Sequence, residues 1–352
     1  MVPVLITSNR PKAGKVFFII GLARQLMQRG YRVGYIKPLG TAPVKKGHDV
    51  YDADAMFIAD ALGLDDPLDI ISPFVISYET QNLILEGGIK DERKKIMAAF
   101  DSLKDRDYVF IHGGADIFEG ASLNVDSLAL AQELDARVVI IEPWRGDISI
   151  DTILGAHKLF GLQFCGGVFN KVPENILAHV TQVVKPFIEK YGVPVYGIFR
   201  KDKLLEAVTV RHLVEALNGK VLCCHDCLGE FVENFSIGAM DVDSALNYFR
   251  RIANKAVITG AHRTDIQLVS METSTKCIIL TGGLNTSDAV IGKARAKGIP
   301  VISVETDTFT TVDKIERIMG HTMIREKGKI DRANEVINLE FDIGKFVRCV
   351  SA

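Results

Sequence analysis

The sequence predicts an α/β protein of two domains, in which a parallel sheet with helices on both faces precedes a smaller α/β domain. Short apolar runs without in-and-out alternation recur along the chain and are separated by amphipathic helical stretches. This pattern is typical of parallel strands that are buried on both faces. The 352 residues, 47% hydrophobic and 24% charged, suffice for two ordinary globular cores.

The first domain, placed at residues 1–220, alternates strands and helices. Apolar runs predict strands at Val4–Ile6, Arg32–Lys37, Tyr108–His112, Arg137–Glu142, Gly166–Phe169 and Val195–Phe199. Between them, amphipathic stretches predict helices at Val16–Arg29, Asp54–Leu62, Ser127–Leu134, Asp151–Phe160 and Ile176–Tyr191. Gly30 is a typical stop for the first helix.

The second domain, placed at residues 221–352, repeats the alternation on a smaller scale and includes a C-terminal extension. Strands are predicted at Val221–Leu222, Lys255–Thr259, Cys277–Leu280 and Val301–Val304, and helices at Ser244–Ile252, Ala289–Lys297 and Thr311–Met319. One further helix is expected within residues 206–219, and Ile266–Val269 is an apolar segment.

Composition excludes several classes of partner and location. The 42 Lys and Arg residues nearly balance 44 Asp and Glu, so neither nucleic acid nor an anionic membrane is an expected partner. No run approaches the roughly 20 apolar residues of a membrane span, and the amino terminus does not have the pattern of a signal peptide. The six cysteines lie mostly in apolar runs, which favours reduced thiols and a cytoplasmic protein.

A phosphate-binding loop is predicted between the first strand and the first helix. Gly14 lets the backbone approach a phosphate, and Lys15 can reach the terminal phosphates. The usual first glycine is replaced by Ser8 or Asn9, depending on the spacing, and the usual Ser or Thr after the lysine is Val16. Because Val16 has no oxygen for Mg²⁺, the sequence favours anion binding over phosphoryl transfer. The expected nucleotide-binding residues here are Ser8, Asn9, Lys12, Ala13, Gly14, Lys15 and Val16.

Together with this loop, the segment Gly34–Gly40, read as GYIKPLG, resembles dethiobiotin synthetase-like P-loop domains. The resemblance implies that Lys37 binds the substrate carboxylate and phosphate and that Asn170 contacts the nucleotide base. It also implies an acidic residue on the strand that ends at His112, so a second magnesium ligand is missing here. The implied cofactor is ATP or another nucleotide, and the sequence argues against Mg²⁺.

The second half is similar to the DRTGG domain. The similarity rests on the segment Gly260–Ile266, read as GAHRTDI, in which His262 replaces the leading Asp, and on Ile278–Gly283, read as IILTGG. The same two domains, in this order, form the amino-terminal region of long phosphate acetyltransferases, which implies a regulatory or assembly role. Since the sequence ends at Ala352, we do not expect acetyl transfer to carry over.

A small-molecule site is also expected in the second domain from the residues themselves. Arg263 could grip a phosphate or carboxylate, and the backbone N–H groups after Thr281 could face an anion. Both segments follow strands, and ligands of open α/β sheets sit at the carboxyl ends of strands. The alternatives are a plain turn and a surface ion pair. The expected ligand-binding residues are His262, Arg263, Asp265, Thr281, Gly282 and Gly283.

Three further groups have weaker claims to function. Cys223, Cys224 and Cys227 supply at most half of a zinc site and do not stand at a helix start, so a strand end is the preferred interpretation. His112 could act as a base, although no nucleophile can be paired with it. The acids Asp49, Asp52 and Asp54 could replace lost metal ligands or simply cap a helix.

The leading hypothesis is therefore a non-catalytic nucleotide- or metabolite-binding regulatory protein, acting as a homo-oligomer by analogy with its relatives. The alternatives are an ATP-dependent ligase resembling dethiobiotin synthetase and a scaffold for a partner enzyme. Whether the chain is an enzyme stays open at this point, with a damaged phosphate loop arguing against it.

Overall fold

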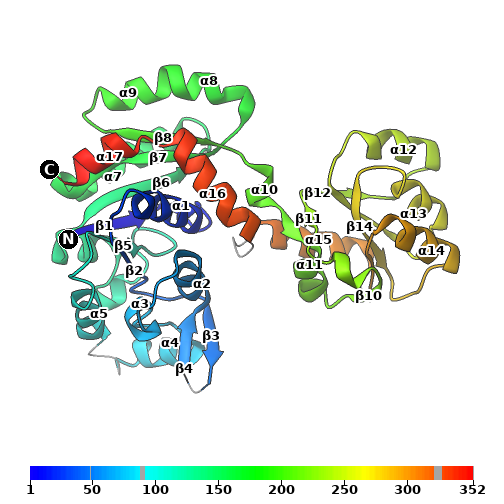
Figure 1. Ribbon diagram of the computed structural model, residues 1–352, viewed down its shortest axis with the longest axis horizontal. Coiled ribbons are helices and arrows are strands. Elements are labelled where there is room, and N and C mark those ends of the chain that lie inside the picture. Colours follow the sequence, from blue (N-terminus) through cyan, green and yellow to red (C-terminus); the bar gives the residue numbers. More distant parts are fainter. Residues whose placement is uncertain (48, 88–91, 321–326, 352) are drawn as a thin grey trace. The chain divides into compact units, whose positions relative to one another are not determined.

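The computed structural model describes residues 1–47, 49–87, 92–320 and 327–351, and the chain divides into two compact units (Figure 1). Unit 1 comprises Met1–Lys201 and the last two helices, α16 (Lys327–Glu340) and α17 (Ile343–Val350). Unit 2 comprises Asp202–Met323, so it is inserted in the sequence of unit 1.

Unit 1 is built on a six-stranded sheet in the order β2-β5-β1-β6-β7-β8, and every strand is parallel to its neighbours. All six predicted strands are present: β1 (Val2–Thr7), β2 (Val33–Ile36), β5 (Tyr108–His112), β6 (Arg137–Pro143), β7 (Phe164–Val172) and β8 (Val195–Arg200). The fold class predicted from the uninterrupted apolar runs is confirmed. The arrangement places the phosphate loop, which follows the central β1, between the carboxyl ends of β5 and β6.

The helices of unit 1 agree with the sequence patterns where the patterns were strong. They are α1 (Lys15–Gln28), α2 (Ala53–Leu62), α3 (Leu68–Ile71), α4 (Tyr78–Leu85), α5 (Glu92–Asp101), α6 (Ser127–Glu133), α7 (Ile148–Phe160), α8 (Leu177–His179) and α9 (Lys185–Glu189). A π-helical turn, Val180–Val184, joins α8 to α9. The sequence patterns did not predict α3, α4, α5 or the antiparallel pair β3 (Pro43–Lys46) and β4 (Asp49–Asp52).

Helices α16 and α17 return to unit 1 and complete it. Helix α16 lies beside α1 (Figure 1), so closely that a Cβ at Gly21 would stand 2.7 Å from the carbonyl oxygen of Ala333. Phe341 then forms an antiparallel bridge with Gly197 at the free edge of β8. Because an uncovered edge strand leaves backbone groups unpaired, this segment both covers the edge and fills the adjoining core.

Unit 2 contains a five-stranded sheet in the order β10-β15-β14-β13-β12, with β10 antiparallel to its neighbour. Its strands are β10 (Lys220–Cys223), β12 (Asn234–Ile237), β13 (Lys255–Gly260), β14 (Thr275–Thr281) and β15 (Val301–Val304), and β9 (Val208–Thr209) pairs with β11 (Phe231–Val232). Its helices are α10 (Lys203–Glu206), α11 (Val210–Leu217), α12 (Val242–Arg250), α13 (Thr264–Ser270), α14 (Asp288–Lys297) and α15 (Thr308–Gly320).

The limits of the units differ from the domains placed at residues 1–220 and 221–352. Residues from Asp202 onward fold with unit 2, because buried Leu213 and Leu217 of α11 join its core. At the other end, α16 and α17 belong to unit 1 because their apolar residues pack there. Among the residues that the structure describes, every helix is too short or too polar to cross a membrane.

Candidate functional site

The loop between β1 and α1 has the backbone that an anion-binding turn needs. Gly14 caps α1 in a left-handed conformation, with φ of 103°. A Cβ at this position would also stand 2.2 Å from Nδ2 of Asn170. Glycine is therefore required here twice, for its conformation and for the close approach of β7. Helix α1 begins directly after it, so the partial positive charge of the helix faces the loop.

Gly14→Ala is expected to distort this loop. The methyl group would displace Asn170, and alanine in the left-handed region costs about 1–2 kcal/mol. We expect weakened nucleotide binding together with a lower unfolding midpoint, measured by titration calorimetry and thermal denaturation. Gly30→Ala is the matched control, since Gly30 has a similar φ of 88° but no atom within 4 Å of the added Cβ. It should lower the midpoint and leave binding unchanged.

Lys15, the first residue of α1, is buried and turned back into the loop. Its Nζ donates a 2.7 Å hydrogen bond to Oγ of Ser8, whose hydroxyl donates in turn to the carbonyl of Arg10 at 2.8 Å. Burial, with repulsion from Lys37, lowers the pKa of Lys15 to about 8. An anion at the loop would offset this unfavourable burial of charge. In the structure, Ser8 Oγ accepts the hydrogen bond from Lys15 that such an anion could accept.

Asn170, expected to contact a nucleotide base, braces the loop in the structure. Its Nδ2 donates to the carbonyl of Ala13 at 2.8 Å, and its Oδ1 accepts from the backbone N–H of Lys171 at 2.8 Å. One amide N–H is left for a ligand. Of the other predicted loop residues, Asn9 and Lys12 are exposed, Ala13 is buried and Val16 is half-buried.

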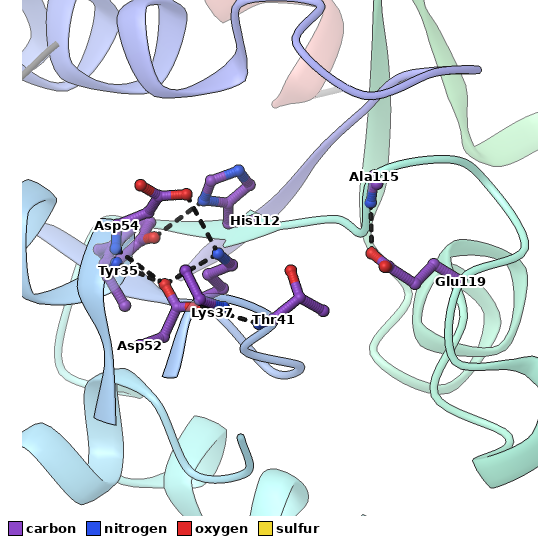
Figure 2. A network of polar contacts seen from close by, with 10 residues as sticks. Tyr35, Lys37, Thr41, Asp52, Asp54, His112, Ala115 and Glu119 are labelled. Carbon is purple, nitrogen blue, oxygen red and sulfur yellow. Dashed lines mark hydrogen bonds and ion pairs between the residues drawn. The ribbon is translucent and has the colours of Figure 1, made fainter. Parts of the chain in front are cut away.

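Lys37, expected to hold a substrate carboxylate, is held by carboxylates of the protein itself (Figure 2). Its Nζ lies 2.8 Å from Asp52 and 3.5 Å from Asp54. Asp52 is completely buried and caps α2, because it also accepts hydrogen bonds from the backbone N–H groups of Thr41, Ala42, Asp54 and Ala55. A substrate carboxylate would have to displace these internal partners.

His112 ends β5, close enough to Lys37 to feel its charge, and is neutral at physiological pH. It shares a 3.0 Å hydrogen bond with the hydroxyl of Tyr35 (Figure 2). Burial, followed by repulsion from Lys37 and Lys15, keeps the pKa of His112 well below its usual value. A base with so low a pKa is weak, which argues against the general-base interpretation.

The anion site predicted in unit 2 differs from expectation at its glycines. The backbone N–H of Gly282 donates to the carbonyl of Thr306 at 3.1 Å, and that of Gly283 donates to Val304 at 2.9 Å. The hydroxyl of Thr281 pairs with that of Thr308 at 2.9 Å. The last residue of β15 and the loop after it thus accept both N–H groups. A ligand at these residues stays a prediction.

The predicted cation of unit 2 is also committed within the protein. Arg263 forms a fork with Asp265, at 3.0 Å and 2.9 Å, and donates to the carbonyl of Met240 at 2.8 Å. Both side chains are partly exposed, and His262 is exposed. The surface ion pair, the alternative that the sequence left open, is the observed arrangement.

The cysteines near the start of unit 2 lie at a strand end and a following turn. Cys223 ends β10, and Cys224 is in the left-handed conformation with φ of 59°. Burial and the neighbouring thiol raise the pKa of Cys224 to about 12. Since the thiolate is the species that ligates metals and exchanges disulfides, neither role is favoured here.

Comparison with known families accounts for most of the chain. Residues 3–209 match the family model described as an AAA domain. The chain belongs to this AAA domain family. Residues 212–318 match the DRTGG domain. The resemblance to a dethiobiotin synthetase-like P-loop domain followed by a DRTGG domain is therefore confirmed.

The individual relatives of this chain are distant from it in sequence. Phosphate acetyltransferase of Nitratidesulfovibrio vulgaris is 23% identical over 96% of this chain and 50% of the relative. The ATP-dependent dethiobiotin synthetase BioD of Methanocaldococcus jannaschii is 26% identical over 58% of this chain and 96% of that enzyme. The Bacillus subtilis protein YtoI is 28% identical over 36% of this chain and 28% of its own length. The chain thus spans about half the length of the phosphate acetyltransferase that it matches.

Two acidic residues of the AAA domain were missed by sequence reasoning. Asp116 and Glu119 follow β5 and, with Asp54, act electrostatically on Lys15. Glu119 accepts a hydrogen bond from the backbone N–H of Ala115 (Figure 2), and Asp116 accepts from Phe118 and Glu119. Their position shortly after the end of a predicted strand could have indicated them. The resemblance instead pointed to position 112 as the place of the acidic residue.

A magnesium site is not formed by the protein groups alone. Within the described ranges, no three His, Cys, Asp or Glu side chains are grouped so that they could hold a metal ion. Val16 has no side-chain oxygen at the position where a phosphate loop usually offers a Ser or Thr hydroxyl to the metal. The residues present do not fit a resident Mg²⁺, and any metal here would need nucleotide phosphate as a ligand.

Proposed function

We propose that this protein binds a nucleotide or a related phosphorylated metabolite at its phosphate loop and acts as a regulatory protein without turnover. The observation that carries the proposal is the buried ammonium of Lys15 at the start of α1, 2.7 Å from Ser8 and next to the left-handed Gly14. A helix start, a glycine turn and a lysine together attract phosphate. Val16 has no side-chain hydroxyl for Mg²⁺, and the described residues form no metal site of their own, which favours binding of the anion over phosphoryl transfer.

The relatives support a regulatory role in which this protein acts together with an enzyme. The family shared with phosphate acetyltransferases and the DRTGG match favour a small-molecule nucleotide as ligand and an enzyme as partner. We do not extend acetyl transfer to this chain, because the match covers half of that relative. Self-association into a homo-oligomer belongs to the same proposal.

A second candidate is an ATP-dependent ligase like the BioD relative. The specific observation in its favour is the acidic surrounding of Lys15 by Asp54, Asp116 and Glu119, which could share Mg²⁺ with bound ATP. Against it, Lys37 is already paired with Asp52. The ligase would need Mg²⁺ with its ATP, whereas a regulatory protein that only binds the nucleotide would not.

Calorimetric titration with ATP, in EDTA and in excess MgCl₂, distinguishes them. The regulatory proposal expects equal affinity in both and no ADP after prolonged incubation. Affinity that depends on magnesium, or steady ADP formation, would favour the ligase. No binding under either condition would overturn both and leave a scaffold. Val16→Thr is a companion variant, because it adds back a hydroxyl at the position of the missing oxygen.

The pH dependence of binding follows from Lys15. Its pKa is about 8 without ligand, and a bound anion must raise that pKa because it stabilises the charged form. The affinity for the anion is therefore greatest below pH 8, where Lys15 is charged with or without ligand. It falls as the pH rises above 8 and free Lys15 loses its proton, by up to tenfold per pH unit. The phosphates are fully ionised in this range and do not cancel the trend. Titrations from pH 7 to pH 10 check this, and a flat profile would contradict it.

A further inference from the structure

A pair of thiols lies where helix α17 packs on the sheet of unit 1. Cys165 is the second residue of β7, and Cys349 is the penultimate residue of α17. The Sγ atom of Cys349 donates a hydrogen bond to the carbonyl oxygen of Cys165 at 3.5 Å. Both side chains are free thiols. The fold thus brings two cysteines that are 184 positions apart in the sequence into direct contact.

The surroundings of the two thiols hold them together. The hydroxyl of Tyr196, on the neighbouring strand β8, donates to the same carbonyl oxygen of Cys165 at 2.6 Å. Phe346, three residues before Cys349 in α17, is completely buried and packs edge-on against the ring of Tyr196, with 5.8 Å between the centroids. The contact between the cysteines therefore joins a helix and a strand that the core already fixes.

The two sulfur atoms differ in their access to a solute. Cys165 is 3% exposed, whereas Cys349 is half-buried. Burial, followed by the charge of Cys349 and a hydrogen bond between the two thiols, raises the pKa of Cys165 to about 12. A small oxidant therefore meets Cys349 first, and Cys165 is the adjacent thiol that can complete a disulfide.

We infer that Cys349 is an oxidative modification site, at which hydrogen peroxide converts Cys349 and Cys165 into a reversible disulfide. The peroxide O–O bond breaks as the Cys349 thiol becomes a sulfenic acid, and one water leaves. The Cys165 thiol then attacks the sulfenic sulfur, so that the S–S bond forms, the S–O bond breaks and a second water leaves. In total the two thiols give up two electrons and two protons, and one hydrogen peroxide becomes two waters.

The disulfide fastens the end of α17 to β7 and closes a loop of sequence that contains all of unit 2, Asp202–Met323. A cross-link over so long a stretch restricts the unfolded chain and stabilises the folded one. Because α16 and α17 follow unit 2 in the chain, oxidation keeps both helices on unit 1. The inference is independent of the proposed function, since it needs no nucleotide at the phosphate loop.

The test treats the native full chain with a small excess of hydrogen peroxide, blocks the remaining thiols by alkylation and maps the peptides by mass spectrometry without reduction. We expect one cross-linked pair of peptides, which contains Cys165 and Cys349 and disappears after dithiothreitol. The thermal unfolding midpoint should rise by about 5–10 °C on oxidation and return on reduction.

Two serine variants are the matched controls. Cys349→Ser should lose both the cross-link and the rise in midpoint. Its reduced form should unfold close to the midpoint of the unchanged protein, because the serine hydroxyl can donate to the same carbonyl oxygen of Cys165. Cys227→Ser replaces another half-buried thiol, in unit 2, and should keep both effects. Cys349→Ala takes the place of the serine variant if that variant does not fold.

The remaining outcomes would overturn the inference. Both thiols could stay reduced, or Cys349 could become a sulfinic or sulfonic acid without a cross-link, and either result would show that Cys165 does not complete the reaction. A cross-link among Cys223, Cys224 and Cys227 in place of this pair would contradict it as well. The cross-link must also form far less in chain unfolded by urea, because an equal yield there would mean that the folded contact does not direct it.

Discussion

Lys15→Met is expected to weaken ATP binding about a hundredfold. Lys15 supplies the one buried ammonium at the start of α1, and a charge-assisted hydrogen bond to phosphate contributes about 1.5–3 kcal/mol, where 1.4 kcal/mol is a factor of ten. Methionine preserves the length and the apolar stem. The unfolding free energy should not fall, because the variant removes a cation whose pKa burial has lowered to about 8.

Calorimetry and chemical denaturation measure these two effects separately. Lys46→Met is the control, since Lys46 is exposed on β3 and should leave ATP affinity unchanged. Equal weakening by both substitutions would mean that only general positive charge matters. Unchanged affinity in Lys15→Met would exclude the loop as the nucleotide site.

Phe341→Ala is expected to lower the unfolding free energy of unit 1 by about 3–5 kcal/mol. Phe341 is 6% exposed, and its ring lies 5.3 Å from Phe18 and 5.6 Å from Phe346, measured between centroids. It also contacts Tyr196 and Phe199 of the sheet. Truncation would leave a cavity between α1, β8 and α17, where neighbouring aromatic rings cannot easily close in.

Leu339→Ala is the matched control two residues away, because Leu339 lies in α16, just before Phe341, and is 70% exposed. Its effect should stay within about 0.5 kcal/mol. Urea denaturation of both variants makes the comparison. If Phe341→Ala were as mild as the control, α16 and α17 would not be part of the unit 1 core.

The fold could be read from the sequence wherever local patterns were strong. The strands of the main sheet follow continuous apolar runs, and Gly298, a typical helix stop, ends α14 in the left-handed conformation with φ of 65°. Helix α4 was missed because it is short and polar, although Ser77 and Thr80 form a capping box at its start. The capping signal alone is weak without an apolar periodicity.

The candidate site was predictable in part, for the same reason. Gly14 and Lys15 are neighbours in sequence, so their loop shows as a motif. Their partners do not, since Asn170 meets the loop from 157 residues away and Asp52 reaches Lys37 through a separate turn. In unit 2 the sequence could not show that the N–H groups of the predicted site have internal acceptors, since Gly282 donates to Thr306 and Gly283 to Val304 of β15.

By itself, the sequence determined the six strands of the main sheet, the phosphate loop at the end of β1 and the loss of the hydroxyl at Val16, because these depend on neighbouring residues. Only the tertiary structure decided which charges are already paired, which N–H groups are already used, and that α16 and α17 rejoin unit 1. Those outcomes depend on burial and on contacts between residues far apart in the chain, and a buried polar group binds whichever partner the fold brings to it.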